Sequence, residues 1–408
     1  MNLDYMIWNG GREIFSYGWL SLRWYGLLFA GGFVLSYIIL SRIFRKEGKP
    51  VTDVDTLTVY MVLATVLGAR LGHVLFYQRE IITSDPLSVL LPFQFNPTFE
   101  FTGFQGLASH GGAFGILFAL WLYTRYLITW SPKKGDDLPE NFNDGNKAIK
   151  SKIKKGFNII RRDKPGQSYI QILDRIVIVV TLTGAMIRLG NFFNSEIIGK
   201  PTDQPFGIVF AGDLREMFTN TPGTIVDYVS VKKNPDAPVG VEGRVPVHIY
   251  LVFKPGTAKA DADHFMVQQA KMNLIRDREF FEEPMGQKLD YVLTEDKGDT
   301  VGMITTTAIA RHPAQLYESI SCFLFFILLY TLWAKGLADK YPGLIFGVFM
   351  IILWTLRFAY EFLKEPQVDF ERTMTLNMGQ ILSIPLMIAG VLILIAALNG
   401  KFQKAWGK

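Results

Sequence analysis

An arginine, two asparagines and a glutamate lie close together near the end of an apolar stretch of the chain. They belong to the run Arg188–Glu196, which contains Asn191 and Asn194. A guanidinium group binds pairs of phosphate or carboxylate oxygens, amides donate hydrogen bonds, and a carboxylate accepts protons. An arginine inside a membrane costs roughly 2.5–3.5 kcal/mol on insertion scales, so it usually faces a partner or a wet cavity. The run is therefore the first candidate for a functional site.

The elements that position this run are predicted to cross a membrane. Seven stretches approach the roughly 20 apolar residues that span a hydrocarbon core. They are 18–40, 57–77, 107–130, 173–192, 315–334, 343–363 and 378–398. The sequence therefore predicts an all-α polytopic membrane protein with seven transmembrane helices. Its single cysteine, Cys322, excludes disulfides within the chain and cysteine-based metal clusters.

The lysines and arginines of the connecting segments predict the orientation. Nineteen of them fall in 41–56, 131–172, 335–342 and the C-terminal tail, against four in the short segments of the other side. We therefore expect the N-terminus to face out and the C-terminus to face in. The net charge of +5 is then mostly a cytoplasmic anchor beside anionic lipid, and no nucleic-acid partner is expected.

Polar residues of the predicted spans fall at one depth. At 1.5 Å per residue, Arg70, Arg188 and Arg357 each lie about 20 Å from the inner boundary. The spans that run inward carry polar residues such as Tyr25 and His110 near their outer ends. These positions predict a shared cavity in the outer half of the membrane. Its positive charge suits an anion, and a phospholipid headgroup is the nearest abundant one.

Two features of this cavity also have purely structural interpretations. Arg357 and Glu361 stand at i and i+4, so they can form a salt bridge that merely neutralises the arginine. Asn191 and Asn194 can cap the end of their helix. On the functional interpretation, the arginine binds phosphate and the amides donate to headgroup or peptide oxygens.

The polar residues of the spans belong to seven short motifs. They are Ser21-Leu-Arg-Trp-Tyr25-Gly, Gly68-Ala-Arg70-Leu-Gly-His-Val-Leu-Phe-Tyr77, His110-Gly-Gly112, Arg188-Leu-Gly-Asn191-Phe-Phe-Asn194-Ser-Glu196-Ile-Ile-Gly199, Arg311-His-Pro-Ala-Gln315-Leu-Tyr317-Glu318, Arg357-Phe-Ala-Tyr-Glu361-Phe and Met378-Gly-Gln380-Ile-Leu-Ser-Ile-Pro385. In this order they resemble the bacterial prolipoprotein diacylglyceryl transferases over all seven spans. The fourth motif is close to the family signature and is highly specific.

The resemblance implies an activity and its partners. A member of this family would transfer the diacylglyceryl group of phosphatidylglycerol to the lipobox cysteine of a prolipoprotein signal peptide. A thioether forms and glycerol phosphate leaves, which is the first step of bacterial lipoprotein maturation. The implied location is the bacterial cytoplasmic (inner) membrane, among its lipids. Neither a metal nor another cofactor is implied.

The resemblance also implies which residues carry the reaction. We expect Arg188 and Arg357 to contact the phosphate. The residues expected to be catalytic are His110, Arg188, Asn191, Glu196, Arg357 and Glu361. Those expected to bind phosphatidylglycerol are Tyr25, Arg70, Arg188, Asn194, Gly199 and Arg357, with Gly199 also supplying a turn as the chain leaves the membrane.

The acceptor of the thiol proton stays open between two alternatives. The substrate thiol must become a thiolate before it attacks. His110, at the start of the third span, is one candidate for the base or for the group that orients it. Alternatively, His110 only hydrogen-bonds the headgroup, and Glu196 or Glu318 takes the proton.

Three features depart from the family pattern. Ile187 stands where the signature usually has glycine, and His73 stands where tyrosine is expected. The outer loop before Arg311 is much longer than usual. We expect this loop, 200–310, to form a small α+β head on the outer face.

The predicted head divides the rest of the chain. Spans 1–4 occupy 1–199, which includes a partly disordered cytoplasmic loop at 131–172, and spans 5–7 occupy 311–408. Within the head, strands are predicted at 223–231, 245–253 and 288–293, and a helix at 260–281. The head would guide the precursor to the cavity, or it would be an insert without a role in the chemistry.

Other function classes fit the sequence less well. A lipid-headgroup binder or a transporter for an anionic amphiphile would also place charges inside the membrane. A transporter should show polar groups through both leaflets and inverted repeats, whereas here the groups stop at one level. An intramembrane serine protease needs a nucleophile and a base, but the adjacent Ser109 and His110 point in different helical directions.

Overall fold

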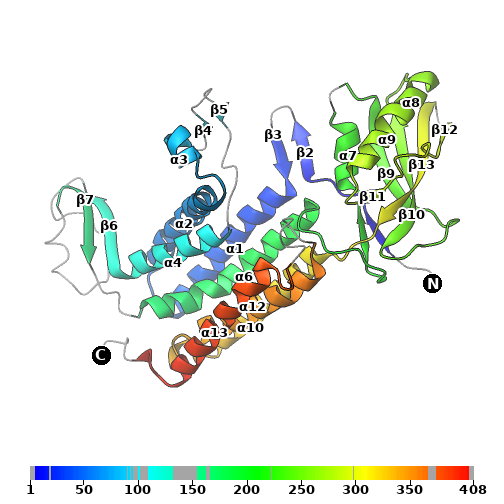
Figure 1. Cartoon of the computed structure of the whole chain (residues 1–408). Coiled ribbons are helices and arrows are strands. Elements are labelled where there is room, and N and C mark those ends of the chain that lie inside the picture. Colours follow the sequence, from blue (N-terminus) through cyan, green and yellow to red (C-terminus); the bar gives the residue numbers. More distant parts are fainter. Residues whose placement is uncertain are drawn as a thin grey trace. The chain divides into compact units, whose positions relative to one another are not determined.

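The computed structural model describes residues 5–17, 20–89, 91, 93–94, 100–101, 109–131, 154–161, 166–221, 223–296, 298–365 and 374–403. Six of its helices are long and apolar enough to cross a membrane (Figure 1). They are α1 (Trp24–Lys46), α2 (Thr52–Tyr77), α6 (Tyr169–Phe193), α10 (Ala314–Ala334), α12 (Leu344–Tyr360) and α13 (Met378–Leu398). The chain is thus a polytopic membrane protein in which helices are combined with sheets.

The third predicted span, 107–130, is only partly helical. Helix α4 (Ser109–Arg125) ends inside it, and the chain continues as strand β6 (Tyr126–Ser131). Aromatic and β-branched residues are frequent from Tyr126 to Trp130, and they favour a strand. The prediction of a helix to residue 130 was therefore wrong.

The first predicted span also begins later than expected. Residues Leu20–Arg23 form strand β3, which pairs antiparallel with β2 (Glu13–Tyr17), so α1 starts at Trp24 rather than at 18. The side chains of Phe15 and Leu22 in this hairpin are exposed. An apolar run alone cannot distinguish a strand from the first turns of a helix.

Helix α6 is the most enclosed of the six. About 67% of its most apolar stretch of 18 residues is buried inside the protein, against 17–28% for the other five helices. The other helices expose apolar side chains such as Ile320, Phe323 and Leu324 of α10, which suits surfaces that face lipid. Arg188, near the end of α6, is therefore carried by the helix with the most protein neighbours.

Contacts divide the chain into two units. The first consists of 1–33, 181–325 and 352–387, and the second of 34–180, 326–351 and 388–408. The sequence-based division at 199 and 310 is different, because several long helices contribute one half to each unit. Arg188 and Arg357 belong to the first unit, whereas Arg70 and His110 belong to the second.

Within the first unit, most of the segment 200–310 folds around a five-stranded antiparallel sheet. The strand order is β11-β13-β10-β9, and β12 also pairs with β13. The strands are β9 (Val226–Lys233), β10 (Arg244–Phe253), β11 (Phe281–Glu282), β12 (Tyr291–Asp296) and β13 (Asp299–Ile309). Three of them overlap the predicted strands. We did not predict β13, the strand that pairs with three others.

Helices cover this sheet and close its core. They are α7 (Gly212–Thr219), α8 (Lys259–Phe265) and α9 (Lys271–Arg276), with a π-helical turn between the last two. Alternate residues of β10 are fully buried, as the two-residue repeat of a half-covered strand requires. One apolar cluster joins these strands to Phe218 and Phe265 of the helices. The predicted helix 260–281 overlaps α8 and α9.

The N-terminal residues complete the head. Strand β1 (Met6–Trp8) pairs in parallel with β8 (Ile208–Phe210). The hydroxyl of Tyr5 donates to the carbonyl oxygen of Pro246 at 2.7 Å. The sequence placed these residues with the membrane core, but their contacts are with the sheet.

In the second unit, α2 and α4 approach closely through glycines. A Cβ atom added at Gly68 would lie 2.5 Å from the carbonyl oxygen of Gly111, and one at Gly115 would lie 2.5 Å from that of Ala64. Only residues without side chains allow backbones this near to each other.

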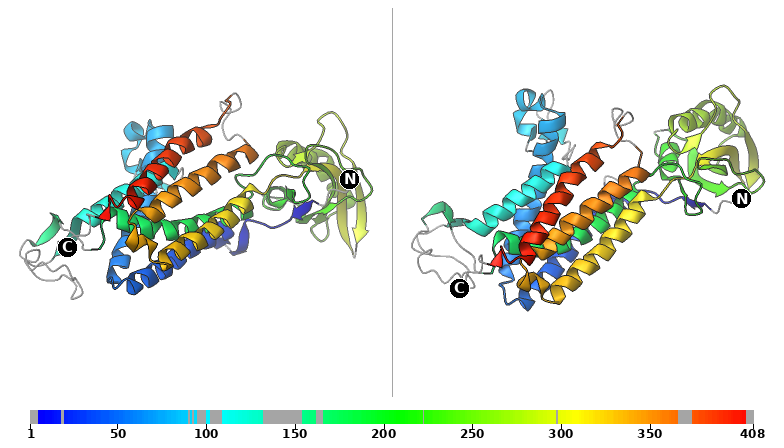
Figure 2. Two further views of the ribbon diagram at one scale, coloured as in Figure 1. Left: turned by 90° about the horizontal axis from the view of Figure 1, so that it is seen from below. Right: turned by 60° about the horizontal axis from the view of Figure 1, so that its bottom comes forward.

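A buried charge cluster holds the other end of α6. The side chain of Arg175 pairs with Glu47 (Nε–Oε1 2.9 Å) and with Asp339 (Nη2–Oδ1 2.6 Å). The neighbouring carboxylate of Asp174 accepts hydrogen bonds from the backbone N–H groups of Gly343 and Phe346 at the start of α12. Orphan N–H groups at a helix start are satisfied in this way. In both views of Figure 2, α12 then runs beside α13.

Candidate active site

The end of α6 forms a small polar cluster around Glu196. The amide of Asn191 donates to Glu196 Oε2 at 3.2 Å, and that of Asn194 donates to Oε1 at 3.1 Å. Among the described residues, the two asparagines therefore bind a carboxylate rather than capping the helix with their side chains. Glu196 itself remains exposed. A carboxylate with one amide on each oxygen is fixed in orientation while it stays open to a ligand.

The backbone after α6 is strained. Ser195 and Ile197 adopt the left-handed conformation, with φ of 55° and 56°. This conformation is unusual for a β-branched residue and costs of order 1–3 kcal/mol. Such strain persists where the surrounding structure fixes the chain. Here the Gln315 amide donates to the carbonyl oxygen of Glu196 at 2.6 Å.

A chain of five charged residues links the two signature arginines. Arg188 Nε lies 2.5 Å from Glu318 Oε2, and Lys364 Nζ pairs with Glu318 Oε1. Lys364 Nζ also lies 3.5 Å from Glu361 Oε1, to which Arg357 Nη2 comes within 3.7 Å. The signs therefore alternate along Arg188–Glu318–Lys364–Glu361–Arg357. We call these five residues the charge chain.

The ends of the charge chain are the parts open to a ligand. The side chain of Lys364 is only 6% exposed, whereas those of Arg188 and Arg357 are 23% and 33% exposed. The two carboxylates neutralise two of the three cations, which leaves one net positive charge for an anion. The salt bridge between Arg357 and Glu361 expected as a structural alternative is present as one link of this chain.

Neighbouring side chains fix the orientation of the carboxylates. Asn377 donates through Nδ2 to Glu361 Oε2 at 3.0 Å. A Cβ atom added at Gly379 would lie 2.9 Å from Glu361 Cδ, so α13 approaches this carboxylate closely. Neither Lys364 nor a role for Asn377 was predicted from the sequence. The spacing of Glu361 and Lys364, three residues apart, was the available signal.

Gly199 is required by crowding rather than by a turn. An added Cβ atom would lie 2.5 Å from the carbonyl oxygen of His312 and 3.0 Å from that of Leu363. Gly199 also forms an isolated bridge with Lys364. The chain leaving α6 therefore passes closely between two neighbouring segments at Gly199. The φ angle of Gly199 is not in the left-handed region. The expectation that Gly199 supplies a turn was wrong.

Tyr25 reaches the same region from α1. A Cβ atom added at Gly190 would lie 2.9 Å from Tyr25 Cδ2, so the tyrosine ring rests on the backbone of α6 beside Asn191. The preceding Trp24 stacks on Phe193 with ring centroids 4.8 Å apart. These contacts place Tyr25 next to the signature run, and its contact with phosphatidylglycerol stays a prediction.

Arg311 is occupied by protein groups. Its Nε donates to the carbonyl oxygen of Glu279 at 2.9 Å, and its Nη1 donates to that of Gly199 and pairs with Glu365, both at 3.1 Å. The side chain is buried. Arg311 therefore joins the head to the chain leaving α6.

Two predicted site residues lie in the second unit. Arg70 donates through Nη2 to the carbonyl oxygen of Ser88 at 2.9 Å. His110 stands in the first turn of α4, and its side chain lies outside the described part of the structure. His73, a departure from the family pattern, lies within α2. The roles predicted for Arg70 and His110 stay predictions.

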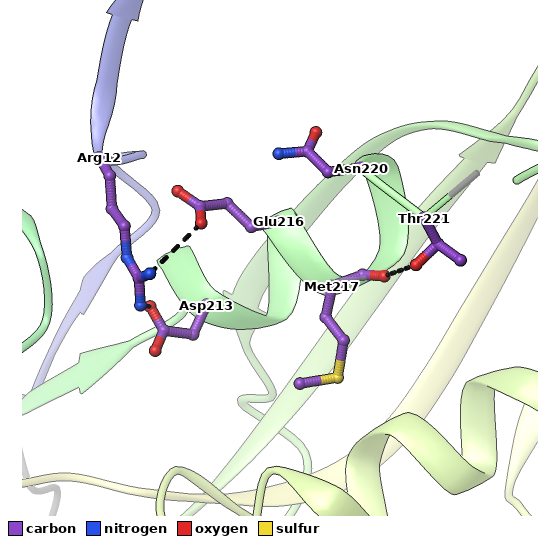
Figure 3. A pocket seen from close by; sticks show the side chains of 6 residues that line it. All are labelled: Arg12, Asp213, Glu216, Met217, Asn220 and Thr221. Carbon is purple, nitrogen blue, oxygen red and sulfur yellow. Dashed lines mark hydrogen bonds and ion pairs between the residues drawn. The ribbon is translucent and has the colours of Figure 1, made fainter. Parts of the chain in front are cut away.

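Two open hollows lie in the head. One, of about 480 Å³, is lined by Arg12, Asp213, Glu216, Met217, Asn220 and Thr221 (Figure 3). Arg12 pairs there with Asp213 at 2.7 Å. The other, of about 470 Å³, is lined by Lys200, Pro201, Thr202, Asp203, Glu242, Arg244, Ile309 and Glu365. Lys200 and Glu365 directly follow Gly199 and Lys364, so the second hollow lies next to the charge chain.

Comparisons with known proteins identify the family of this chain. Residues 12–133 and 155–396 match the family model described as prolipoprotein diacylglyceryl transferase. The chain is similar to the phosphatidylglycerol–prolipoprotein diacylglyceryl transferase of Tolumonas auensis, with 27% identity over 97% of this chain and 99% of that protein. The protein of the same name from Bacteroides fragilis is 28% identical over 94% of this chain and 92% of that protein. The one from Chloroherpeton thalassium is 28% identical over 97% of this chain and 96% of that protein. The match covers most of the chain, and we conclude that it belongs to the prolipoprotein diacylglyceryl transferase family.

Proposed function

We propose that this chain transfers the diacylglyceryl group of phosphatidylglycerol to the lipobox cysteine of prolipoproteins. The observation that carries the proposal is the charge chain. It holds Arg188 and Arg357 at its two ends, leaves both guanidinium groups partly open, and has one net positive charge. A phosphodiester in the membrane is an anion that such a pair of forks can bind.

The reaction breaks one bond and forms another. The thiolate sulfur attacks the glyceryl carbon, a carbon–sulfur bond forms, and the carbon–oxygen bond to phosphate breaks with its electron pair on oxygen. Glycerol phosphate leaves with more negative charge than the bound diester had. Arg188 and Arg357 stabilise this charge as it develops, because they are fixed before the reaction and sit where little water competes.

The thiol proton requires an acceptor within the site. Glu196 is exposed and held by two amides, which supports it as the acceptor or as the group that orients the substrate. Glu318 already forms ion pairs with Arg188 and Lys364, so proton uptake by Glu318 would weaken both pairs. His110 remains the other candidate, as base or as a donor to the headgroup.

We further propose that α4 is the third of seven spans and that its polar start with His110 lies at the outer face. The lysines and arginines of the connecting segments support an N-terminus that faces out and a C-terminus that faces in. The head then lies on the outer face of the inner membrane. We propose that the hollow between Lys200 and Glu365 guides the precursor, because it adjoins Lys364 and carries both signs of charge for an extended polypeptide.

A mass measurement tests this function. The purified protein in detergent is incubated with phosphatidylglycerol and a lipobox peptide, beside the same peptide with its cysteine changed to serine. We expect the mass of one diacylglyceryl group on the cysteine peptide only, with release of glycerol phosphate. Lipid binding without any gain in mass would instead favour a headgroup binder or a transporter for an anionic amphiphile.

A further inference from the structure

A hairpin in the second unit takes no part in the proposed chemistry. Strand β6 continues directly from α4 and pairs antiparallel with β7 (Gly156–Arg161) (Figure 1). The segment 134–154 between the two strands falls outside the match to the family model. Both strands lie within the matched residues, and the proposed reaction gives them no role.

One face of the hairpin is apolar and uncovered. The register pairs Trp130 with Phe157 and Ile128 with Ile159, and alternate residues of a strand point to the same side. Trp130, Phe157 and Ile159 are 67%, 68% and 60% exposed, whereas Ile160 on the opposite face is buried. A large apolar face left open in this way marks a surface for a partner or a membrane.

This face continues a surface that suits lipid. Along α4, the exposed Phe118 stacks on Trp121 with ring centroids 5.8 Å apart. Trp121 in turn lies 5.7 Å from the ring of Tyr126, the first residue of β6. An unbroken row of aromatic rings therefore leads from the apolar side of a membrane-type helix onto the hairpin.

Positive charges flank the apolar face. Arg125 precedes β6, Lys154 and Lys155 precede β7, and Arg161 ends it, and all four side chains are exposed. Aromatic rings at the level of the headgroups, with lysines and arginines beside them, are typical of segments that lie on an anionic membrane. A protein partner would need a surface complementary to this combination, whereas anionic phospholipid supplies both chemistries at once.

We propose that the β6–β7 hairpin docks with Trp130, Phe157 and Ile159 in the interface of the membrane that holds the long helices, and that its basic residues bind anionic headgroups. The hairpin then lies at the lipid surface, directly after the end of α4. Docking needs no transferase activity, so the proposal stands apart from the proposed function.

Accessibility measurements in a bilayer test the docking. Spin labels are placed on Phe157→Cys or, as the control, on the half-exposed Val292→Cys of β12, each in a Cys322→Ala background. The full chain is held in phosphatidylglycerol-containing nanodiscs with one molecule per disc. Collisions with oxygen, which concentrates in lipid, are compared with collisions with a water-soluble nickel chelate. We expect a several-fold higher oxygen-to-nickel ratio at 157 than at 292, and equal ratios would overturn the proposal.

Two further comparisons separate lipid from other occupants. Trp130→Glu should lower the ratio at 157 and Trp130→Phe should keep it, because only the first places a charge on the apolar face. Exchanging Lys154 and Lys155 for glutamine should lower the ratio in anionic discs and leave it unchanged in discs of phosphatidylcholine. If the ratio at 157 changes neither with the lysine substitutions nor with the lipid charge, the proposed binding of anionic headgroups is contradicted. If residue 157 is shielded from the nickel chelate only when two molecules share a disc, then a second copy of the chain covers the face and the proposal is overturned.

Discussion

Lys364 lies where two carboxylates would otherwise face each other across a poorly hydrated space. A buried charge is costly unless it is paired, and Lys364 is paired with both Glu318 and Glu361. Each of those carboxylates also holds one signature arginine. Lys364 therefore acts as a positioning residue, because it sets the places of Arg188 and Arg357 without lying at an exposed end of the charge chain.

Removal of this cation should weaken the site. In Lys364→Met, the two carboxylates repel each other and both compete for the arginines. We expect kcat/KM to fall by about 10- to 100-fold, as when a residue that orients a metal ligand is lost. Lys364→Arg should lose less, because it keeps the charge. The exposed Lys335→Met serves as a matched control. Transfer rates for Lys364→Met close to those of the control would contradict the role.

Substitution at Gly199 tests the crowded exit from α6. In Gly199→Ala, the new methyl group must displace the backbone of His312 or Leu363, at a cost of typically 1–3 kcal/mol. The shift moves Lys364 and Arg311, so activity should fall with stability. Gly286→Ala is the control, since nothing lies within 4 Å of its added Cβ atom. Equal melting temperatures and activities for the two variants would refute the crowding argument.

At the scale of elements, α6 is fixed at both ends by charged groups of different kinds. Arg188 at one end belongs to the charge chain. Arg175 at the other end is buried, and it pairs with Glu47 and Asp339. These ion pairs oppose movement of the helix along its axis, which suits an element that presents a signature arginine.

Loss of the inner cluster should destabilise the protein. Arg175→Met removes one partner of Glu47, which keeps Lys49 and Trp333. The loss should therefore stay below the roughly 3–5 kcal/mol of a buried charge left without any partner. The exposed Arg42→Met, on α1, should be nearly neutral. Thermal unfolding in detergent measures both variants. If the melting temperature of Arg175→Met equals that of the wild type, the cluster is not needed to hold α6.

The head should lose stability as the pH rises. Burial, with help from Asp213 and Glu279, raises the pKa of the Asp277 carboxyl from 3.8 to about 7, and Asp277 Oδ2 has no hydrogen-bond partner among the described residues. The folded head keeps this proton between about pH 4 and pH 7 while the unfolded chain has lost it. The free energy of unfolding therefore falls across that window, by at most about 4 kcal/mol.

An uncharged side chain should remove this pH dependence. Asp277→Asn is expected to stabilise the head at pH 8 and to leave it unchanged near pH 4, because the wild-type carboxyl is then protonated in both states. Hydrogen exchange of β10 amides in the full chain, measured against pH, gives the local stability. The exposed Asp227→Asn of β9 is the control. A slope that survives in Asp277→Asn would assign the pH dependence to another group.

At the scale of the whole molecule, the membrane helices and the family were predictable from the sequence because both signals are local. Long apolar runs give six of the seven predicted spans, and the signature around Arg188 gives the family. The strands of the head followed from alternation in β10, but β13 was missed, since Gly302 and its threonines weaken the pattern. The start of α1 and the end of α4 were misplaced, because short apolar strands read as helix.

The links between distant residues were not predictable in the same way. Glu318 and Lys364 are 46 positions apart in the sequence, and only the fold brings their side chains together. Likewise, the charge of Arg311 would allow it to bind phosphate. Only the structure shows that its guanidinium group donates to the carbonyl oxygens of Glu279 and Gly199 instead. Contacts of this kind depend on packing between elements, which a single sequence does not encode locally.

The proposed function requires that Arg188 and Arg357 together bind the phosphate and stabilise the leaving group. The most direct measurement is kcat/KM for diacylglyceryl transfer to a lipobox peptide by Arg188→Gln, Arg357→Gln and the double variant, beside Arg215→Gln of the head. We predict that each single change costs about 10²–10³-fold, as for other prepositioned donors, and that the double change costs less than the product because both act on one anion. Activities of the single variants within a few-fold of Arg215→Gln would contradict the account.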